Sequence, residues 1–141
     1  MMKPRFLSLL LLTLLAACAS GSGNLLIHNA WIRPADAGMN TAAYFVIEST
    51  GEEDRLLSVE SRLAESTEIH RSYVDEAGVM RMQEQAFVII PADGSISFEP
   101  GGLHIMFIEL NRDLVLDEQI QLQLHFEKQG EITIDVPVEI P

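Results

Sequence analysis

Cysteine is almost absent from this chain of 141 residues, which contains only Cys18. A single cysteine cannot form an intramolecular disulfide, so an exported domain of this size must be stabilised by its hydrophobic core. If Cys18 carries a lipid, no thiolate remains for a metal ion. A blue-copper electron-transfer centre needs a cysteine ligand, so that class of protein is largely excluded.

Basic residues are also scarce, with 9 Lys and Arg against 21 Asp and Glu. Without Lys3 and Arg5 of the N-terminal leader, seven basic residues remain, which gives a formal charge of −14. Such a surface argues against nucleic acid or anionic lipid as a direct partner. It suits attraction of cations and docking to a basic protein, although an ordinary solvated acidic surface is an equally good interpretation.

Long hydrophobic runs are missing except for residues 6–17, which follow Lys3 and Arg5. This run is too short for a membrane span of roughly 20 residues, and its layout is that of a secretory signal. It ends in Leu15-Ala16-Ala17-Cys18, which resembles a bacterial lipobox. The alternative is an ordinary secreted protein that is cut at a small-residue site.

The leader therefore predicts three parts of the chain. Residues 1–17 form a lipoprotein signal peptide, residues 18–24 a lipidated Cys18 with a flexible tether, and residues 25–141 one β-domain. We expect a periplasmic lipoprotein of the cell envelope, attached to a membrane through its lipid. Ala19 after Cys18 is not an acidic retention signal, which favours the outer membrane.

The rest of the chain predicts an all-β fold. Short segments with β-type alternation are separated by Gly, Pro and Asp turns, and many short strands at even spacing favour a Greek-key β-sandwich. A helical turn around Ala64 is the only helical alternative. The expected strands are 25–33, 41–49, 55–60, 67–74, 79–83, 87–90, 95–99, 103–110, 119–127 and 131–139.

Histidines and methionines form the one chemically distinctive set. Imidazole nitrogens and thioether sulfurs together make soft, neutral ligands that favour Cu(I). Residues two apart on a strand share a face, so His104 and Met106 point the same way, as do Met80 and Met82. Each residue taken alone has a commoner interpretation as surface or packing. The candidate ligands are His70, Met82, His104 and Met106.

A hairpin centred on Glu76 would bring the first two candidates together. In that register His70 lies opposite Met82, close enough to share one ion. A register slip would destroy this pairing. Met80 and Met39 are expected to be neighbours of the site, with core packing as the more natural role for Met39, and His28 and His125 have no assigned role.

The spacing resembles the signature of the PCu(A)C family of periplasmic copper chaperones. That signature is His, an optional Met, ten residues, Met, twenty-one residues, then His, any residue and Met, and every obligatory position matches here. The segments Gly78-Val79-Met80-Arg81-Met82 and Pro100-Gly101-Gly102-Leu103 also resemble the family, as does Trp31-Ile32-Arg33 followed by Ala43-Tyr44-Phe45. Arg71 departs from the pattern, because it stands at the optional Met position and is expected to add a charge beside the site.

The resemblance implies a cupredoxin-like, immunoglobulin-like Greek-key β-sandwich that binds Cu(I) through the four matched residues. It also implies delivery of copper to the assembly of a respiratory cytochrome c oxidase, with a thioredoxin-like assembly protein or an oxidase subunit as the copper-accepting partner. No arrangement of residues specific to catalysis is present, so we do not expect an enzyme. Two alternatives stay open, a copper-scavenging resistance lipoprotein and a metal-free β-sandwich assembly module.

Overall fold

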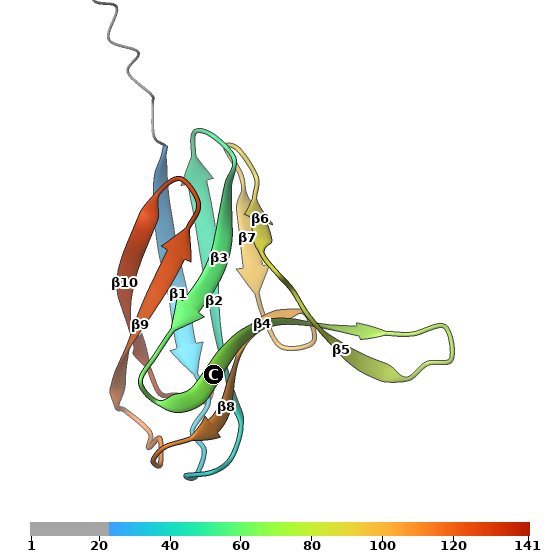
Figure 1. The fold of residues 1–141 in the computed structure, drawn as a ribbon, viewed down its shortest axis with the longest axis vertical. Helices are drawn as coiled ribbons and strands as arrows, with labels where there is room; N and C mark the ends of the chain where they lie inside the picture. The colour runs from blue at the N-terminus through green and yellow to red at the C-terminus, as the bar shows by residue number, and fades with distance from the viewer. Residues whose placement is uncertain (1–22) are drawn as a thin grey trace, which may run out of the picture.

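A computed structural model describes residues 23–141, so the predicted signal peptide and the lipidation of Cys18 lie outside the described residues. The described part is all-β and contains two sheets (Figure 1). The strands are β1 (Asn24–Ile32), β2 (Thr41–Thr50), β3 (Asp54–Glu60), β4 (Ala64–Val74), β5 (Met80–Glu84), β6 (Val88–Ile90), β7 (Ser95–Phe98), β8 (Leu103–Leu110), β9 (Gln119–Phe126) and β10 (Gly130–Pro137). All ten predicted strands are confirmed, with ends that differ by three residues or fewer.

The region around Ala64 is not helical. Ala64 is the first residue of β4, where it pairs with Leu110 of β8. Its side chain is buried with that of Leu63 in the hydrophobic core. The helical alternative was wrong because packing and ladder hydrogen bonds override a weak local preference.

The larger sheet has the strand order β1-β2-β7-β8-β4-β5, and the smaller one has the order β10-β9-β3-β6. Their inner faces enclose a core in which Phe45, Phe107 and Leu122 are almost fully buried. On β8 the residues Leu103, Ile105 and Phe107 all belong to this core. Because successive side chains alternate, the residues between them point to the outer face of the larger sheet.

The hairpin of β4 and β5 extends away from the two sheets (Figure 1). We call residues 71–84 the arm. Every residue of β5 is exposed, and the apolar side chains of Val74, Met80 and Met82 on the arm are more than half exposed. β5 is an edge strand that pairs only with β4. The arm is therefore held by backbone pairing and has little core of its own.

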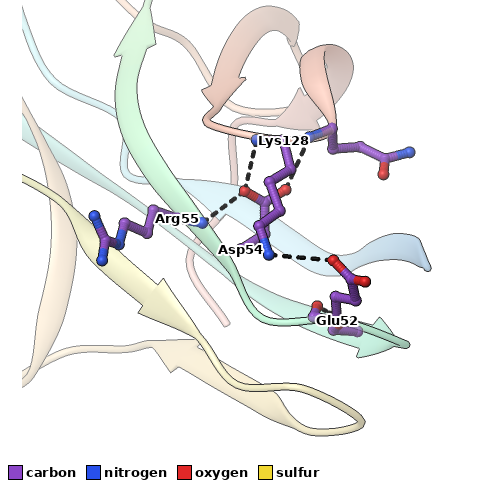
Figure 2. A network of polar contacts seen from close by, with 6 residues as sticks. Glu52, Asp54, Arg55 and Lys128 are labelled. Atoms are coloured by element: carbon purple, nitrogen blue, oxygen red, sulfur yellow. Dashed lines mark hydrogen bonds and ion pairs between the residues drawn. The ribbon is translucent and has the colours of Figure 1, made fainter. Parts of the chain in front are cut away.

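Asp54 is a buried carboxylate that ties the smaller sheet together (Figure 2). It accepts hydrogen bonds from the backbone N–H groups of Arg55, Lys128 and Gln129 at 2.7, 2.9 and 2.9 Å. These bonds join the start of β3 to the turn between β9 and β10. The Nζ of Lys128 also lies 3.3 Å from Glu52, in an exposed ion pair.

We expect Asp54→Ala to lower the free energy of unfolding by about 2–4 kcal/mol, because three backbone donors lose a charged acceptor. Urea unfolding followed by circular dichroism measures this loss. Glu52→Ala is the matched control, since it removes only the exposed ion pair and should change stability by less than about 0.5 kcal/mol. Equal effects of the two substitutions would show that the Asp54 network has no special weight.

No helix among residues 23–141 has the length and apolar character needed to cross a membrane.

Candidate metal site

The outer face of the larger sheet brings both candidate histidines together. His70 on β4 is the direct partner of His104 on β8, and their ring centroids are 5.8 Å apart at an interplanar angle of 75°. One step along the same two strands, Glu68 lies opposite Met106. Three of the four candidates therefore occupy adjacent positions on two paired strands.

Met82 reaches the same face by a different register from the one predicted. β4 and β5 pair so that Met82 lies opposite Ser72 and His70 lies opposite Glu84, so the expected pairing of His70 with Met82 is wrong by two residues. An even shift keeps every side chain on its face. Met82 is thus a diagonal neighbour of His70, at a separation that a long side chain can bridge.

The turn explains the shift. Gly78 adopts a positive φ of 78°, and the backbone N–H of Asp75 donates to the carbonyl of Val79. The Asp75 carboxylate in turn accepts hydrogen bonds from the N–H groups of Ala77 and Val79. This is a three-residue loop closed by a left-handed glycine, so its centre is Ala77 instead of Glu76.

A pocket of about 400 Å³ lies over this face, and Met82, His104 and Met106 all line it. Met80 lines the same pocket, in agreement with its expected place as a neighbour. His70 is adjacent to the pocket through its ring contact with His104. The other lining residues are Arg33, Pro34, Asn40, Thr41, Ala42, Tyr44, Ser72, Pro100 and Gly101.

Two expectations about the surroundings were wrong. Met39 is 60% exposed and neither packs in the core nor lines the pocket. Arg71 pairs with Leu103, whose side chain belongs to the core, so strand alternation places Arg71 on the opposite face from His70. Arg71 lines a separate pocket with Gln83 and Phe87. The cation that does line the candidate pocket is Arg33.

Two aromatic residues that were not predicted to belong to the site, Tyr44 and Trp31, follow the two imidazoles across the same face. The ring of Tyr44 on β2 lies 6.4 Å from that of His104, and Trp31 on β1 lies 4.5 Å from Tyr44. The guanidinium of Arg33 lies 5.8 and 5.5 Å from the Trp31 and Tyr44 ring centroids, within cation–π range.

A β-bulge in β1 brings Trp31 to this face. Between His28 and Trp31 the strand has one residue more than β2, and Asn29 takes a positive φ of 52°. Without the extra residue Trp31 would face the core, so the bulge sets its direction. Asparagine tolerates the left-handed conformation better than most residues. Its presence at position 29 is the only sign of the bulge in the sequence.

The hydrogen bonds of His104 fix which nitrogen can bind an ion. Its Nδ1 lies 3.1 Å from the carbonyl oxygen of Gly102, which can only accept a hydrogen bond. Nδ1 therefore carries the proton of the neutral ring, and Nε2 keeps a free lone pair. His104 is 96% buried, and this desolvation lowers its pKa below the ordinary 6.5. The Gly102 carbonyl opposes the shift, whereas the charges of His70 and Arg33 add to it.

Pairing of His70 with Glu68 is the second polar contact of the site. The Nε2 of His70 lies 2.7 Å from a carboxylate oxygen of Glu68, while its Nδ1 is buried and has no hydrogen-bond partner. A buried polar atom without a partner is uncommon and calls for a bound ion or water. The donor set thus fits a soft cation, with two imidazole lone pairs and two thioethers. Which residues bind an ion stays a prediction.

No group of three or more His, Cys, Asp and Glu side chains in the described part of the chain could hold a metal ion.

Comparison with known proteins gives the family. The family model described as "Putative lipoprotein LpqE-like" matches residues 25–138. The chain belongs to the LpqE-like family. A relative, the "Putative lipoprotein Lxx21020" of Leifsonia xyli subsp. xyli (strain CTCB07), is 31% identical over 115 residues, which cover 80% of this chain and 68% of the relative.

Solved structures with the same fold are PCuAC domains. The apo PCuAC domain from PmoF1 is 27% identical with a TM-score of 0.72, covering 85% of this chain and 97% of that domain. The copper-bound PCuAC domain from PmoF2 is 25% identical with a TM-score of 0.70, covering 85% and 96%. These matches confirm the predicted resemblance to the PCu(A)C family and the predicted cupredoxin-like β-sandwich.

The lowered pKa of His104 predicts how the stability of the metal-free protein depends on pH. The unfolded chain takes up the proton at the ordinary pKa of 6.5, whereas the folded chain resists it to lower pH. Stability from neutral His104 is therefore complete above about pH 6.5 and is lost as pH falls through the lowered folded pKa.

Urea unfolding of the metal-free wild type and of His104→Gln, from about pH 8 to about pH 5, measures this effect. Below pH 6.5 the wild type should lose stability relative to the variant, because glutamine has no proton to take up. Parallel stability curves for the two proteins would contradict the prediction.

Proposed function

We propose that this protein is an extracytoplasmic Cu(I)-binding metallochaperone that carries one ion on the outer face of its larger sheet. The proposed ligands are His70, Met82, His104 and Met106. The observation that carries the proposal is the direct pairing of His70 with His104, which lines one pocket together with the thioethers of Met82 and Met106. That a structural neighbour is a copper-bound domain adds support.

The ligand chemistry favours Cu(I) over harder ions. Two imidazoles and two thioethers are all neutral, so these four ligands do not supply the anionic oxygens that Mg²⁺, Ca²⁺ or Mn²⁺ prefer. Thioethers take up no proton at physiological pH, and only the two imidazoles make binding pH-dependent. The absence of thiolate also avoids loss of the site by disulfide formation or other thiol oxidation in an oxidising compartment.

The exposure of the ligands suits transfer to a partner. His104 is buried, whereas Met82 is 52% exposed on the arm. A partner can therefore approach the ion from the side of β5 and replace ligands one at a time. We propose cysteine ligands on the acceptor, because thiolates bind Cu(I) more strongly than thioethers do.

The proposed acceptor belongs to cytochrome c oxidase assembly, either a thioredoxin-like assembly protein or an oxidase subunit. A lipid on Cys18 would hold the carrier in the cell envelope. The lipoprotein description shared by the family and the relative supports the anchor.

Cu(I) titration against a chromophoric chelator tests the site. The wild-type domain should withdraw one equivalent of Cu(I), and the Met82→Ala/Met106→Ala double variant should bind at least about a hundredfold more weakly. We base this on the 10- to 100-fold losses caused by removal of mere outer-shell partners of metal sites. Met39→Ala is the matched control, since that methionine is exposed outside the pocket and its loss should not change binding. Equal competition by wild type and double variant would sink the proposed site.

Deletion of the gene tests delivery. In cells grown at low copper we expect cytochrome oxidase activity to fall, and to return when copper is added or when wild-type protein is restored. The Met82→Ala/Met106→Ala variant should not restore it, whereas Met39→Ala should. Normal oxidase activity in the deletion strain, together with increased sensitivity to excess copper, would instead support scavenging.

A further inference from the structure

Three histidines of the described chain contact a glutamate, and they differ in which nitrogen lacks a hydrogen bond. His28 and His125 approach Glu48 and Glu60 through Nε2 at 3.1 and 3.5 Å, yet that same nitrogen is buried without a hydrogen bond. At His70 the Nε2 contact is a hydrogen bond of 2.7 Å, and the buried atom without a partner is Nδ1. The contact of His70 is therefore the one with directional geometry.

That geometry determines the tautomer of His70. An ionised carboxylate can only accept a hydrogen bond, so Nε2 must donate and must carry the proton. Nδ1 of the neutral ring then has a free lone pair. With 14% of the His70 side chain and 33% of the Glu68 side chain exposed, water competes weakly for this bond. His104 shows the reverse arrangement, since its Nδ1 donates to Gly102.

The strand itself places Glu68 for this role. Glu68 precedes His70 by two positions on β4, so both side chains point to the outer face. Glu68 also lies directly opposite Met106, one of the proposed ligands. The carboxylate is thus beside two proposed ligands at once. With Cu(I) bound to the proposed ligands, its negative charge would offset part of the positive charge that four neutral ligands leave on the ion.

We propose that Glu68 is a positioning residue that holds His70 as the Nε2–H tautomer and thereby makes Nδ1 the copper-binding atom. The inference rests on the proposed function and goes one step beyond it. The two imidazoles then present different nitrogens to the ion, Nδ1 from His70 and Nε2 from His104. A hydrogen bond from the ring to a carboxylate also fixes ring orientation and increases ligand basicity.

Nitrogen-15 NMR of the histidine rings tests the proposal without reference to copper delivery. In the metal-free wild type, at a pH well above the ordinary imidazole pKa of about 6.5, His70 should show a protonated Nε2. Glu68→Ala should give a mixture of tautomers. Glu68→Gln should keep the wild-type tautomer, because its amide oxygen still accepts the hydrogen bond.

The same spectra with Cu(I) identify the bound nitrogen. We expect the ion to shift the Nδ1 resonance of His70 and to leave Nε2 protonated. Copper on Nε2 would overturn the inference and leave the proposed function intact. Copper that shifts neither nitrogen of His70 nor of His104 would overturn both. The wild-type spectra alone decide this point, whatever the stability of the variants.

Competition with a chromophoric chelator measures how much Glu68 contributes to the affinity for Cu(I). Glu68→Ala should weaken Cu(I) binding by about 10- to 100-fold, and Glu68→Gln should weaken it less. Glu48→Ala is the matched control, since it removes the same charge beside a strand histidine of the same sheet, and it should change binding by less than about twofold. If both substitutions of Glu68 weakened Cu(I) binding equally and left the tautomer of His70 unchanged, Glu68 would act only through its charge. That result would overturn the positioning role.

Discussion

The inward packing of β8 is the constraint on which the rest of the site depends. Leu103, Ile105 and Phe107 are buried at the centre of the larger sheet, and each contributes about 1.5–3 kcal/mol of hydrophobic stabilisation. A slip of one residue would exchange this set for His104 and Met106 and would lose that stabilisation. The core thus holds the two outward side chains in register, although neither belongs to the core. Pairing of β8 with β4 then sets His70 and Glu68 beside them.

This arrangement gives the site a rigid side and a loose side. His70, His104 and Met106 lie on two paired strands of the larger sheet, with backbone and carboxylate hydrogen bonds to both imidazoles. Met82 lies on an edge strand whose residues are all exposed. Segments with few buried contacts open at low free-energy cost. In the proposed carrier, protection and release of the ion would therefore depend on different elements of the same small domain.

Much of this architecture could be predicted from the sequence, because alternation is a strong signal on half-buried strands. Ten strands and the shared face of His104 and Met106 followed from it. The register of the β4–β5 hairpin did not, because it depends on whether Gly78 closes a loop of three residues. The eleven residues that lie between His70 and Met82 do not reveal this.

The residues around the site differ in how well the sequence predicts their positions. Arg71 follows His70 in the sequence, yet strand alternation places it on the opposite face, and the strand period alone predicts this. The same period places Glu68 with His70, so the carboxylate was within reach of sequence reasoning. The bulge at Asn29, which turns Trp31 outward, could not be predicted in this way, because a single asparagine in a strand rarely indicates a bulge.

If the proposed ligands hold Cu(I), the corrected register also implies an order in which they would leave the ion. Met82 is bound to the sheet only through β5, and its partner on β4 is Ser72, beyond the histidine pair. Displacement of β5 by an acceptor would remove this thioether and leave the two imidazoles and Met106 in place. An incoming thiolate could then take the vacated position while Gly102 and Glu68 still orient the histidines. In the predicted register, with Met82 directly opposite His70, opening the arm would disturb both ligands together. In the proposed transfer, the two-residue shift would thus separate the step that admits the acceptor from the step that gives up the ion.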